Sequence, residues 1–180
     1  QYPDIRYHIS SGNAEYVLEY LDKGLIDFGL LFREPDPQKY EYRALEMRDT
    51  WGVLMRRDSP LAQKKTVCPE DLWGLPLIIS HQRGDDQYLA QWMKRDVSEL
   101  NVAATYNLVF NASLLVDEGV GYALCLDRLI HTQGSSLCFR PFSPRLEATG
   151  YLVWKKYQVF SKAAGLFLRF VQNRLSGGQN

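Results

Sequence analysis

The chain has 180 residues, and its 21 Lys and Arg side chains are balanced by 21 Asp and Glu side chains. This neutral balance argues against non-specific nucleic-acid binding by the segment, because phosphate binding needs a basic face. A hydrophobic fraction of 46% and a charged fraction of 23% are typical of a soluble globular domain and exclude disorder, collagen and coiled coil. No apolar run approaches the roughly 18–20 residues of a membrane span.

The first part of the chain has the pattern of a strand, a helix and a second strand. Ile5–Ile9 alternates apolar and polar residues, which predicts a strand. Ala14–Leu21 has the apolar spacing of a helix, and Gly24 is a natural stop for it. The apolar run Ile26–Phe32 predicts the second strand. This order predicts a βαβ unit with a right-handed crossover.

Two extended pieces, Tyr42–Met47 and Trp51–Arg56, are expected on either side of Arg48-Asp49. A second series of strands and helices follows. The strands are expected at Leu77–Ser80, Val102–Asn107 and Gly121–Leu126. The helices are expected at Asp85–Val97 and Asn111–Glu118, and Asn111 is expected to cap the second of them. Further extended runs are expected at Leu137–Phe142 and Thr149–Trp154, and a last helix near Ser161.

Alternating strands and helices predict parallel or mixed sheets with helices on both faces. Because the strand and helix series form two clusters, we expect two lobes that share the chain, with no single sheet through both. The segments Tyr42–Arg56 and Leu137–Trp154 are expected to run side by side between the lobes, and the last helix to close the first lobe.

Several short motifs occur in a recognisable order. They are Tyr2–Ile5 with Leu18–Asp27, Arg57–Ala62, Asp71–Ile78, Leu115–Gly121, Leu152–Lys156 and Phe167-Leu168. In this order, over nearly the whole chain, they resemble the effector-binding domain of LysR-type transcriptional regulators. Ser59 stands where the family's H-P-L-A region has His, and Asp71–Ile78 matches its D-L-x-G-x-P-x-I.

The resemblance implies an α/β, two-lobed fold like that of type 2 periplasmic binding proteins. Each lobe would be a mixed sheet flanked by helices, with two crossover segments. Lobe I would comprise residues 1–50 and 146–180, and lobe II residues 51–145. The resemblance further implies that lobe I's first strand, most of its first helix and the family's DNA-binding winged helix-turn-helix lie outside this segment. A full-length homodimer or homotetramer is implied as well.

The candidate ligand site follows from the rule that open α/β sheets bind ligands outside the carboxyl ends of their strands. Helix N-termini there favour an anion, so we expect a small effector, carrying a carboxylate, held between the lobes. The expected contacts are Phe32, Arg33, Ser80, His81, Gln82, Asn107 and Phe110. Phe32 points to a partly apolar or aromatic effector, and His81 to binding that depends on pH. A loop arginine such as Arg33 also commonly points to solvent.

Motifs and residues of other protein classes occur without the residues that normally accompany them. Asp27-Phe28-Gly29 matches the kinase magnesium motif, but no Gly-rich loop or His-Arg-Asp motif accompanies it. The three His residues have no metal-ligand spacing, so no metal and no cofactor are expected. The three cysteines are widely separated, which favours a reducing cytoplasm and argues against a disulfide sensor: Cys68, Cys125 and Cys138.

The leading prediction is a ligand-sensing domain of a bacterial LysR-type regulator, located in the cytoplasm. It would bind a small molecule and contact DNA only through the N-terminal domain outside this segment, with no membrane partner. The alternative is a solute-binding protein of a transport system, which has a similar two-lobed shape. An enzyme on the same scaffold is a third possibility, but no acid/base pair in the sequence points to a reaction. We therefore predict that the chain is not an enzyme.

Overall fold

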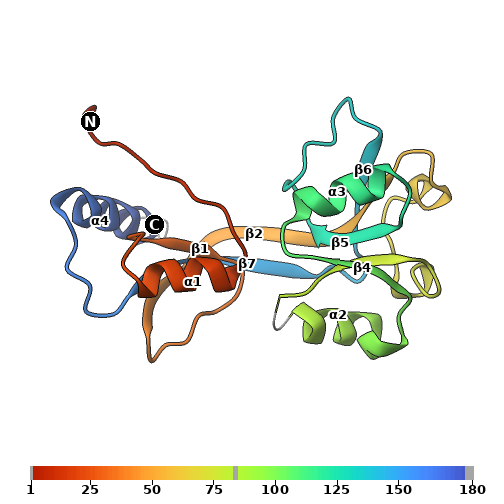
Figure 1. Ribbon diagram of the computed structural model, residues 1–180, viewed down its shortest axis with the longest axis horizontal. Helices are drawn as coiled ribbons and strands as arrows, with labels where there is room; N and C mark the ends of the chain where they lie inside the picture. The colour runs from red at the N-terminus through yellow and green to blue at the C-terminus, as the bar shows by residue number, and fades with distance from the viewer. Residues whose placement is uncertain (1, 83–84, 177–180) are drawn as a thin grey trace. The chain divides into compact units, whose positions relative to one another are not determined.

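The computed structural model describes residues 2–82 and 85–176 (Figure 1). The chain separates into two compact units, which we call unit 1 (residues 1–48 and 149–180) and unit 2 (residues 49–148). Both crossings occur inside strands, in β2 (Tyr40–Arg56) and in β7 (Glu147–Lys155). The lobe boundaries expected from the sequence, at residues 50 and 146, stay a prediction.

Strand β2 is the longest in the chain, and it replaces the two extended pieces expected around Arg48-Asp49. It neighbours β7 and also pairs with β6 (Leu137–Pro141), so the expected pairing of the two crossover segments is confirmed. The strands form one path in the order β1-β7-β2-β5-β3-β4, with β6 beside β2. The expectation that no sheet runs through both parts was therefore wrong, because β2 and β7 each continue from one unit into the other.

Unit 2 contains a mixed sheet with helices on both faces (Figure 1). Strand β3 (Leu77–Ser80) is parallel to β4 (Val102–Tyr106) and to β5 (Tyr122–Leu126). Strand β2 is antiparallel to β5 and β6. The helices are α2 (Asp85–Met93) and α3 (Val109–Asp117), in the expected alternation with the strands.

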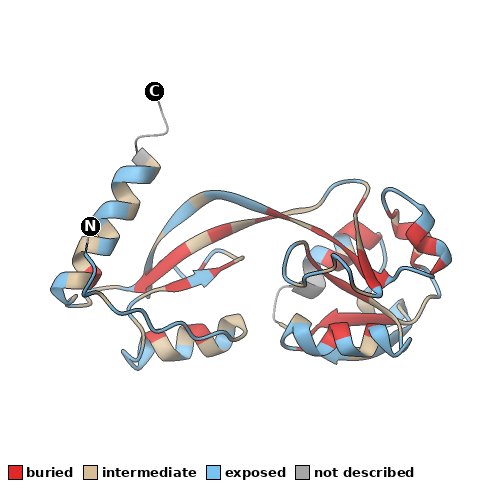
Figure 2. Cartoon of the chain, turned by 90° about the horizontal axis from the view of Figure 1, so that it is seen from above, coloured by how far each residue is buried: buried red, intermediate tan, exposed pale blue. Residues whose placement is uncertain are grey.

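The core of unit 2 lies where α3 packs on the sheet. Leu54, Ile78 and Ala123 come from three adjacent strands, and all are buried together with Ala112 and Val116 of α3. Burying a side chain as large as that of Leu54 or Ile78 stabilises the fold by about 1.5–3 kcal/mol. Figure 2 shows buried residues concentrated along the strands of this unit.

Unit 1 is built around α1 (Ala14–Asp22), β1 (Gly29–Leu31), β7 and α4 (Lys162–Ser176). Asn13 caps α1, because its Oδ1 accepts a hydrogen bond from the Tyr16 N–H at 2.9 Å. The helix buries Val17 and Leu21 against β1, which pairs with β7 in antiparallel register. Gly29 permits this close approach, since a Cβ there would overlap the Val17 side chain.

The strand expected at Ile5–Ile9 does not form, so the expected βαβ unit with its right-handed crossover is also wrong. An alternating segment becomes a strand only where its backbone finds a partner and its apolar side a core. Here Tyr7 is 74% exposed and Ile9 is 91% exposed, and residues 2–13 pair with no strand in the described part of the chain.

Two helix boundaries in unit 2 also differ from the expectation. Helix α2 ends at Met93 rather than Val97, because Lys94 adopts a left-handed φ of 54°. Helix α3 begins at Val109, so Asn111 lies inside its first turn and is not its cap. Val109 packs against the core cluster, and this packing draws the first turn into the helix ahead of the better capping residue.

Candidate ligand-binding site

The parallel strands of unit 2 place several polar segments at one edge of the sheet. Because β3 is parallel to both β4 and β5, the carboxyl ends of all three strands lie at that edge. Strand β3 ends at Ser80 and is followed by His81 and Gln82. Strand β4 is followed by Asn107, and Phe110 lies in the first turn of α3. The structure thus brings five of the predicted contacts to one edge. We call them the strand-end cluster, and their role in binding stays a prediction.

His81 is held by the neighbouring strand end. Its backbone N–H donates to the Tyr106 carbonyl at 3.1 Å, and its Nδ1 lies 3.0 Å from the same oxygen. A carbonyl oxygen can only accept, so Nδ1 carries a proton in this arrangement. The ring is therefore oriented, and Nε2 is the nitrogen left to contact a ligand.

The other members of the cluster differ in how far they are exposed. Ser80 is 2% exposed, and its Oγ accepts a hydrogen bond from the Gln82 N–H at 3.3 Å. The Ser80 hydroxyl thus helps to form the turn that carries His81 and Gln82. Asn107 is exposed, and Phe110 is 64% exposed, so both side chains are open to a ligand.

The amino end of α3 adds backbone donors to the same edge. Leu108 precedes the helix and supplies no side-chain cap. The first N–H groups of a helix have no partner within it and give this end a partial positive charge. An anionic group placed beside Asn107 and Phe110 would meet these donors.

Phe32 and Arg33 belong to unit 1, where they follow β1 directly and are half-buried. They are not among the residues that the unit 2 edge brings together. Arg83, which the sequence places in the loop after β3, lies outside the described residues.

The third strand end at this edge was not predicted from the sequence. Strand β5 is followed by Asp127 and Arg128, whose backbones are fixed locally. The Asp127 N–H donates to the Thr50 carbonyl at 2.9 Å, and the Asp127 Oδ1 accepts from the Arg128 N–H at 2.8 Å. The signal was available, because β5 was expected from its apolar run and the strand-end rule applies to it equally.

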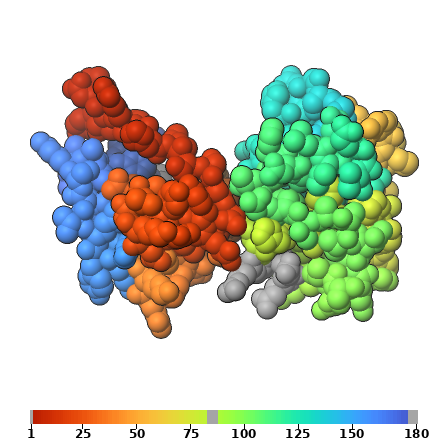
Figure 3. Space-filling model, in the orientation of Figure 1, coloured from red at the N-terminus to blue at the C-terminus, as the bar shows by residue number. Residues whose placement is uncertain are grey.

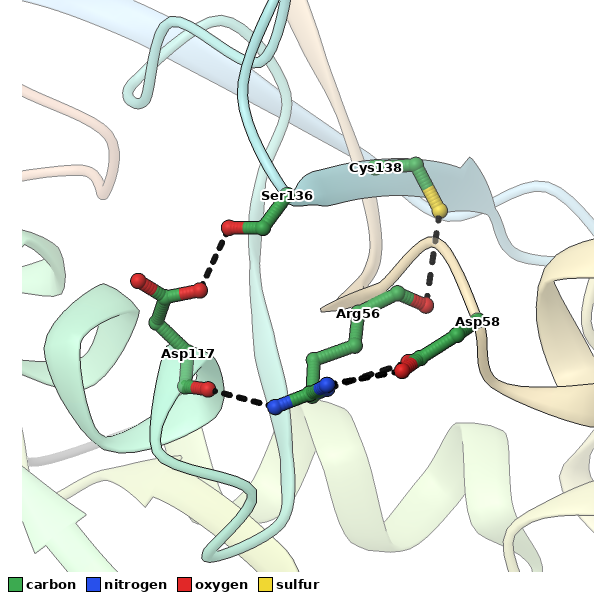
Figure 4. A network of polar contacts seen from close by, with 5 residues as sticks. All are labelled: Arg56, Asp58, Asp117, Ser136 and Cys138. Carbon is green, nitrogen blue, oxygen red and sulfur yellow. Dashed lines mark hydrogen bonds and ion pairs between the residues drawn. The ribbon is translucent and has the colours of Figure 1, made fainter.

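A polar network anchors the far end of α3 (Figure 4). The Arg56 guanidinium donates to the Asp117 carbonyl at 2.9 Å and pairs with Asp58 at 2.7 Å, and it lowers the pKa of the Asp58 carboxyl. The Ser136 hydroxyl donates to the Asp117 carboxylate. A cation at a helix C-terminus is favourable, so the network holds the helix whose amino end faces the strand-end cluster.

Side chains that bind metals or react with oxidants are sparse in the described chain. No group of three His, Cys, Asp or Glu side chains is placed to hold a metal ion in residues 2–82 and 85–176. All three cysteines are free, and burial raises the pKa of the Cys125 thiol to about 12. None of the described helices is both long enough and apolar enough to cross a membrane.

Residues 1–176 match the family model of the LysR substrate binding domain. The chain is 23% identical over 124 residues to YvbU, an HTH-type transcriptional regulator of Bacillus subtilis (strain 168), covering 69% of this chain and 41% of YvbU. It is 24% identical over 166 residues to YfeR, another HTH-type regulator, of Shigella flexneri, covering 91% of this chain and 54% of YfeR. The chain thus spans about half the length of these relatives.

Solved structures show the same fold. The effector binding domain of QuiR in complex with shikimate superposes with a TM-score of 0.79 at 15% identity, covering 94% of this chain and 81% of that one. The regulatory domain of CcmR from Synechocystis PCC6803, in complex with 2-PG, gives 0.77 at 18% identity, with coverages of 94% and 83%. Neither these structures nor the two relatives are described as transport proteins. The chain therefore belongs to the LysR substrate-binding domain family, as a ligand-sensing regulatory domain with the fold of type 2 periplasmic binding proteins.

Proposed function

We propose that this domain binds a small organic acid at the strand-end cluster of unit 2 and thereby controls transcription by the full regulator. The observation that carries the proposal is the convergence of two loops and an uncapped helix N-terminus at one sheet edge. DNA would be contacted only through a helix-turn-helix domain, which the two HTH-type relatives have by name.

The chemistry of the edge favours a carboxylate. Backbone N–H groups of α3 and the Asn107 amide are donors suited to an anion, and the oriented His81 ring presents Nε2, which would accept a hydrogen bond from a hydroxyl group of the ligand. Shikimate and 2-phosphoglycolate, bound by two structural neighbours, both carry a carboxylate. The exposed Phe110 ring adds an apolar contact, so the ligand would also have an apolar part. Phe32 and Arg33 of unit 1 remain predicted contacts.

Regulation then requires a difference in affinity between two states of the protein. A ligand shifts a conformational equilibrium only by as much as it prefers one state. A shift from 1:99 to 99:1 would need about a 10⁴-fold preference. We propose no reaction and no catalytic residue, since the relatives are transcriptional regulators. The full protein would act in the cytoplasm as a homodimer or homotetramer, as the family resemblance implies.

Calorimetric titration with a panel of small organic acids, including shikimate and 2-phosphoglycolate, tests the proposal. An acid that binds should lose at least fivefold in affinity with His81→Ala and with Asn107→Ala. His8→Ala is the matched control, because His8 is exposed in unit 1 and should leave the affinity within twofold. Arg33→Ala tests the contact predicted in unit 1. If an acid binds and neither His81→Ala nor Asn107→Ala weakens it, the assignment to the strand-end cluster is wrong.

A further inference from the structure

Unit 2 contains a surface groove whose lining shares no residue with the strand-end cluster. It is a groove of about 710 Å³, and we call it the arginine groove. It is lined by β6 and the loop after it, by the loop from β5 to β6, and by parts of β2 and residue 66. Figure 3 shows the loop from β5 to β6 in teal at the top of unit 2.

The lining is strongly basic although the chain as a whole is neutral. The lining includes four arginines and one carboxylate, that of Asp127; the arginines are Arg57, Arg128, Arg140 and Arg145. The formal charge of the lining is therefore four minus one, or three positive charges. Glu147, outside the lining, offsets one of them through its ion pair with Arg145 at 2.9 Å. A concave surface that carries charges of mostly one sign attracts ligands of the opposite charge.

Two of these arginines are fixed in place by neutral acceptors. Arg140 donates from Nε to the Lys64 carbonyl at 2.7 Å and from Nη2 to the Ala62 carbonyl at 2.8 Å. Arg57 donates from Nε to the Ser135 carbonyl at 2.8 Å. Carbonyl groups orient a guanidinium without neutralising it. Arg140 also donates from Nη1 to the Phe139 carbonyl at 2.8 Å, and Arg57 from Nη2 to the Thr132 carbonyl at 2.6 Å. Because a guanidinium has five N–H donors, Arg140 keeps two of them for a ligand and Arg57 keeps three.

The remaining two arginines lie toward the β5 end of the groove. Arg145 donates from Nη2 to the Thr50 hydroxyl at 3.1 Å. Arg128 follows Asp127 with a left-handed φ of 64°, and its side chain is exposed. Its guanidinium has no hydrogen bond or ion pair among the described residues. Thr66, Thr132 and Ser143 supply hydroxyl groups along the same lining.

We propose that the arginine groove binds a small polyvalent anion, one that carries two or more adjacent acidic groups such as linked phosphates. Its volume lies within the range of about 300–1,000 Å³ that is usual for small-molecule sites. Arginine forks match phosphate and carboxylate oxygens in pairs, so a polyvalent anion engages several of them together. Bound there, it connects the loop from β5 to β6 with β6 itself and stabilises unit 2.

Inorganic pyrophosphate is the probe, titrated calorimetrically into the chain at constant ionic strength. Saturable binding of one pyrophosphate and a rise in melting temperature are expected, and Arg128→Gln should weaken the affinity at least fivefold. Arg95→Gln is the matched control, because it removes the same charge from unit 2 outside the groove, where Arg95 stacks on Trp73. It should leave the affinity within twofold. Circular dichroism of both variants verifies that they fold.

The absence of saturable binding would overturn the proposal, and so would an equal loss with Arg95→Gln, which would indicate diffuse charge attraction. The proposal is separable from the effector site. His81→Ala should leave pyrophosphate affinity within twofold, and pyrophosphate should not displace an organic acid bound at the strand-end cluster. Mutual displacement of the two ligands would show one shared site and would refute a second one.

Discussion

The two units of this chain are stabilised in different ways. Most of the large, fully buried side chains in the described residues lie in unit 2, whereas unit 1 contributes Leu21 and Val153. Unit 2 has parallel strands with helices on both faces, whereas β1 and β7 of unit 1 are antiparallel. Helix α4 of unit 1 is largely exposed or half-buried (Figure 2).

This contrast explains why more of the predicted ligand contacts come together in unit 2 than in unit 1. Parallel strands place their carboxyl ends at one edge, so loops distant in sequence, after β3 and β4, meet there. An antiparallel pair such as β1 and β7 places its carboxyl ends at opposite edges. Phe32 and Arg33 therefore have no second strand end paired with β1 to support them. A rigid core in unit 2 also holds ligand-contacting side chains in fixed positions.

The largest effect is expected for Ile78→Ala in the core of unit 2. Ile78 is fully buried, so its truncation leaves a cavity and should lower the free energy of unfolding by about 2–5 kcal/mol. Urea denaturation measures this loss. Leu30→Ala is the control, because Leu30 lies on β1 of unit 1 and is 48% exposed, and it should cost less than about 0.5 kcal/mol. Equal losses would contradict the contrast between the units.

The next effect is expected at Gly52, where β2 lies close against β6. A Cβ at Gly52 would overlap the Arg140 carbonyl oxygen and the Phe139 ring. Gly52→Ala should therefore force the strands apart and destabilise unit 2 by about 1–3 kcal/mol, as overpacking does. Thermal unfolding measures it. An unchanged melting temperature would show that β6 is loosely attached.

Gly165→Ala should have the opposite sign and a smaller size. Gly165 lies in α4 of unit 1, and an added Cβ there meets nothing within 4 Å. Alanine costs less backbone entropy than glycine in a helix, so stability should rise by about 0.5–1 kcal/mol. Together with Gly52→Ala, this variant compares the same substitution in both units. A loss of stability would mean that α4 packs more tightly than its exposure indicates.

The smallest effect is expected for the dependence of stability on pH. Hydrogen bonds from Lys64 to Asp71 and from Ser98 to Asp96, both in unit 2, lower the pKa of each carboxyl. A lowered folded-state pKa adds stability above the unfolded pKa of about 3.9, and this stability is lost as pH falls through the folded value. Asp71→Asn should cost less than about 1 kcal/mol at pH 7, as surface ion pairs do, and progressively less as pH falls through the folded pKa. Unfolding titrations at pH 7 and pH 3 test this difference. A cost as large at pH 3 as at pH 7 would assign the effect to packing.

The sequence predicted the elements whose signals are local. Strand β3 begins with the apolar run Leu77–Ile79, and α1 has both an apolar stripe and the Asn13 cap, so both formed as expected. Ile5–Ile9 failed because a strand depends on a partner that the segment does not find. Strand β2 merged two expected pieces because its pairing with β5, β6 and β7 carries it through the charged residues between them.

The candidate site divides in the same way. The loops after β3 and β4 could be predicted, since the strand-end rule needs only the order of elements. The arginine groove could not, because it depends on pairing across long sequence distances. Arg140 of β6 contacts the Ala62 carbonyl only because β6 pairs with β2, and Ala62 lies in the segment that follows β2. No local pattern around either residue indicates the contact.

Binding of an organic acid at the strand-end cluster of unit 2 is the function that we propose. Nuclear magnetic resonance of the isotopically labelled chain, titrated with the acid that binds most tightly in calorimetry, tests it most directly. We predict that the largest shifts occur at His81, Asn107 and the backbone amides of Val109 and Phe110, with saturation at the calorimetric affinity. Shifts confined to the arginine groove or to α4, with these amides unchanged at saturation, would contradict the account.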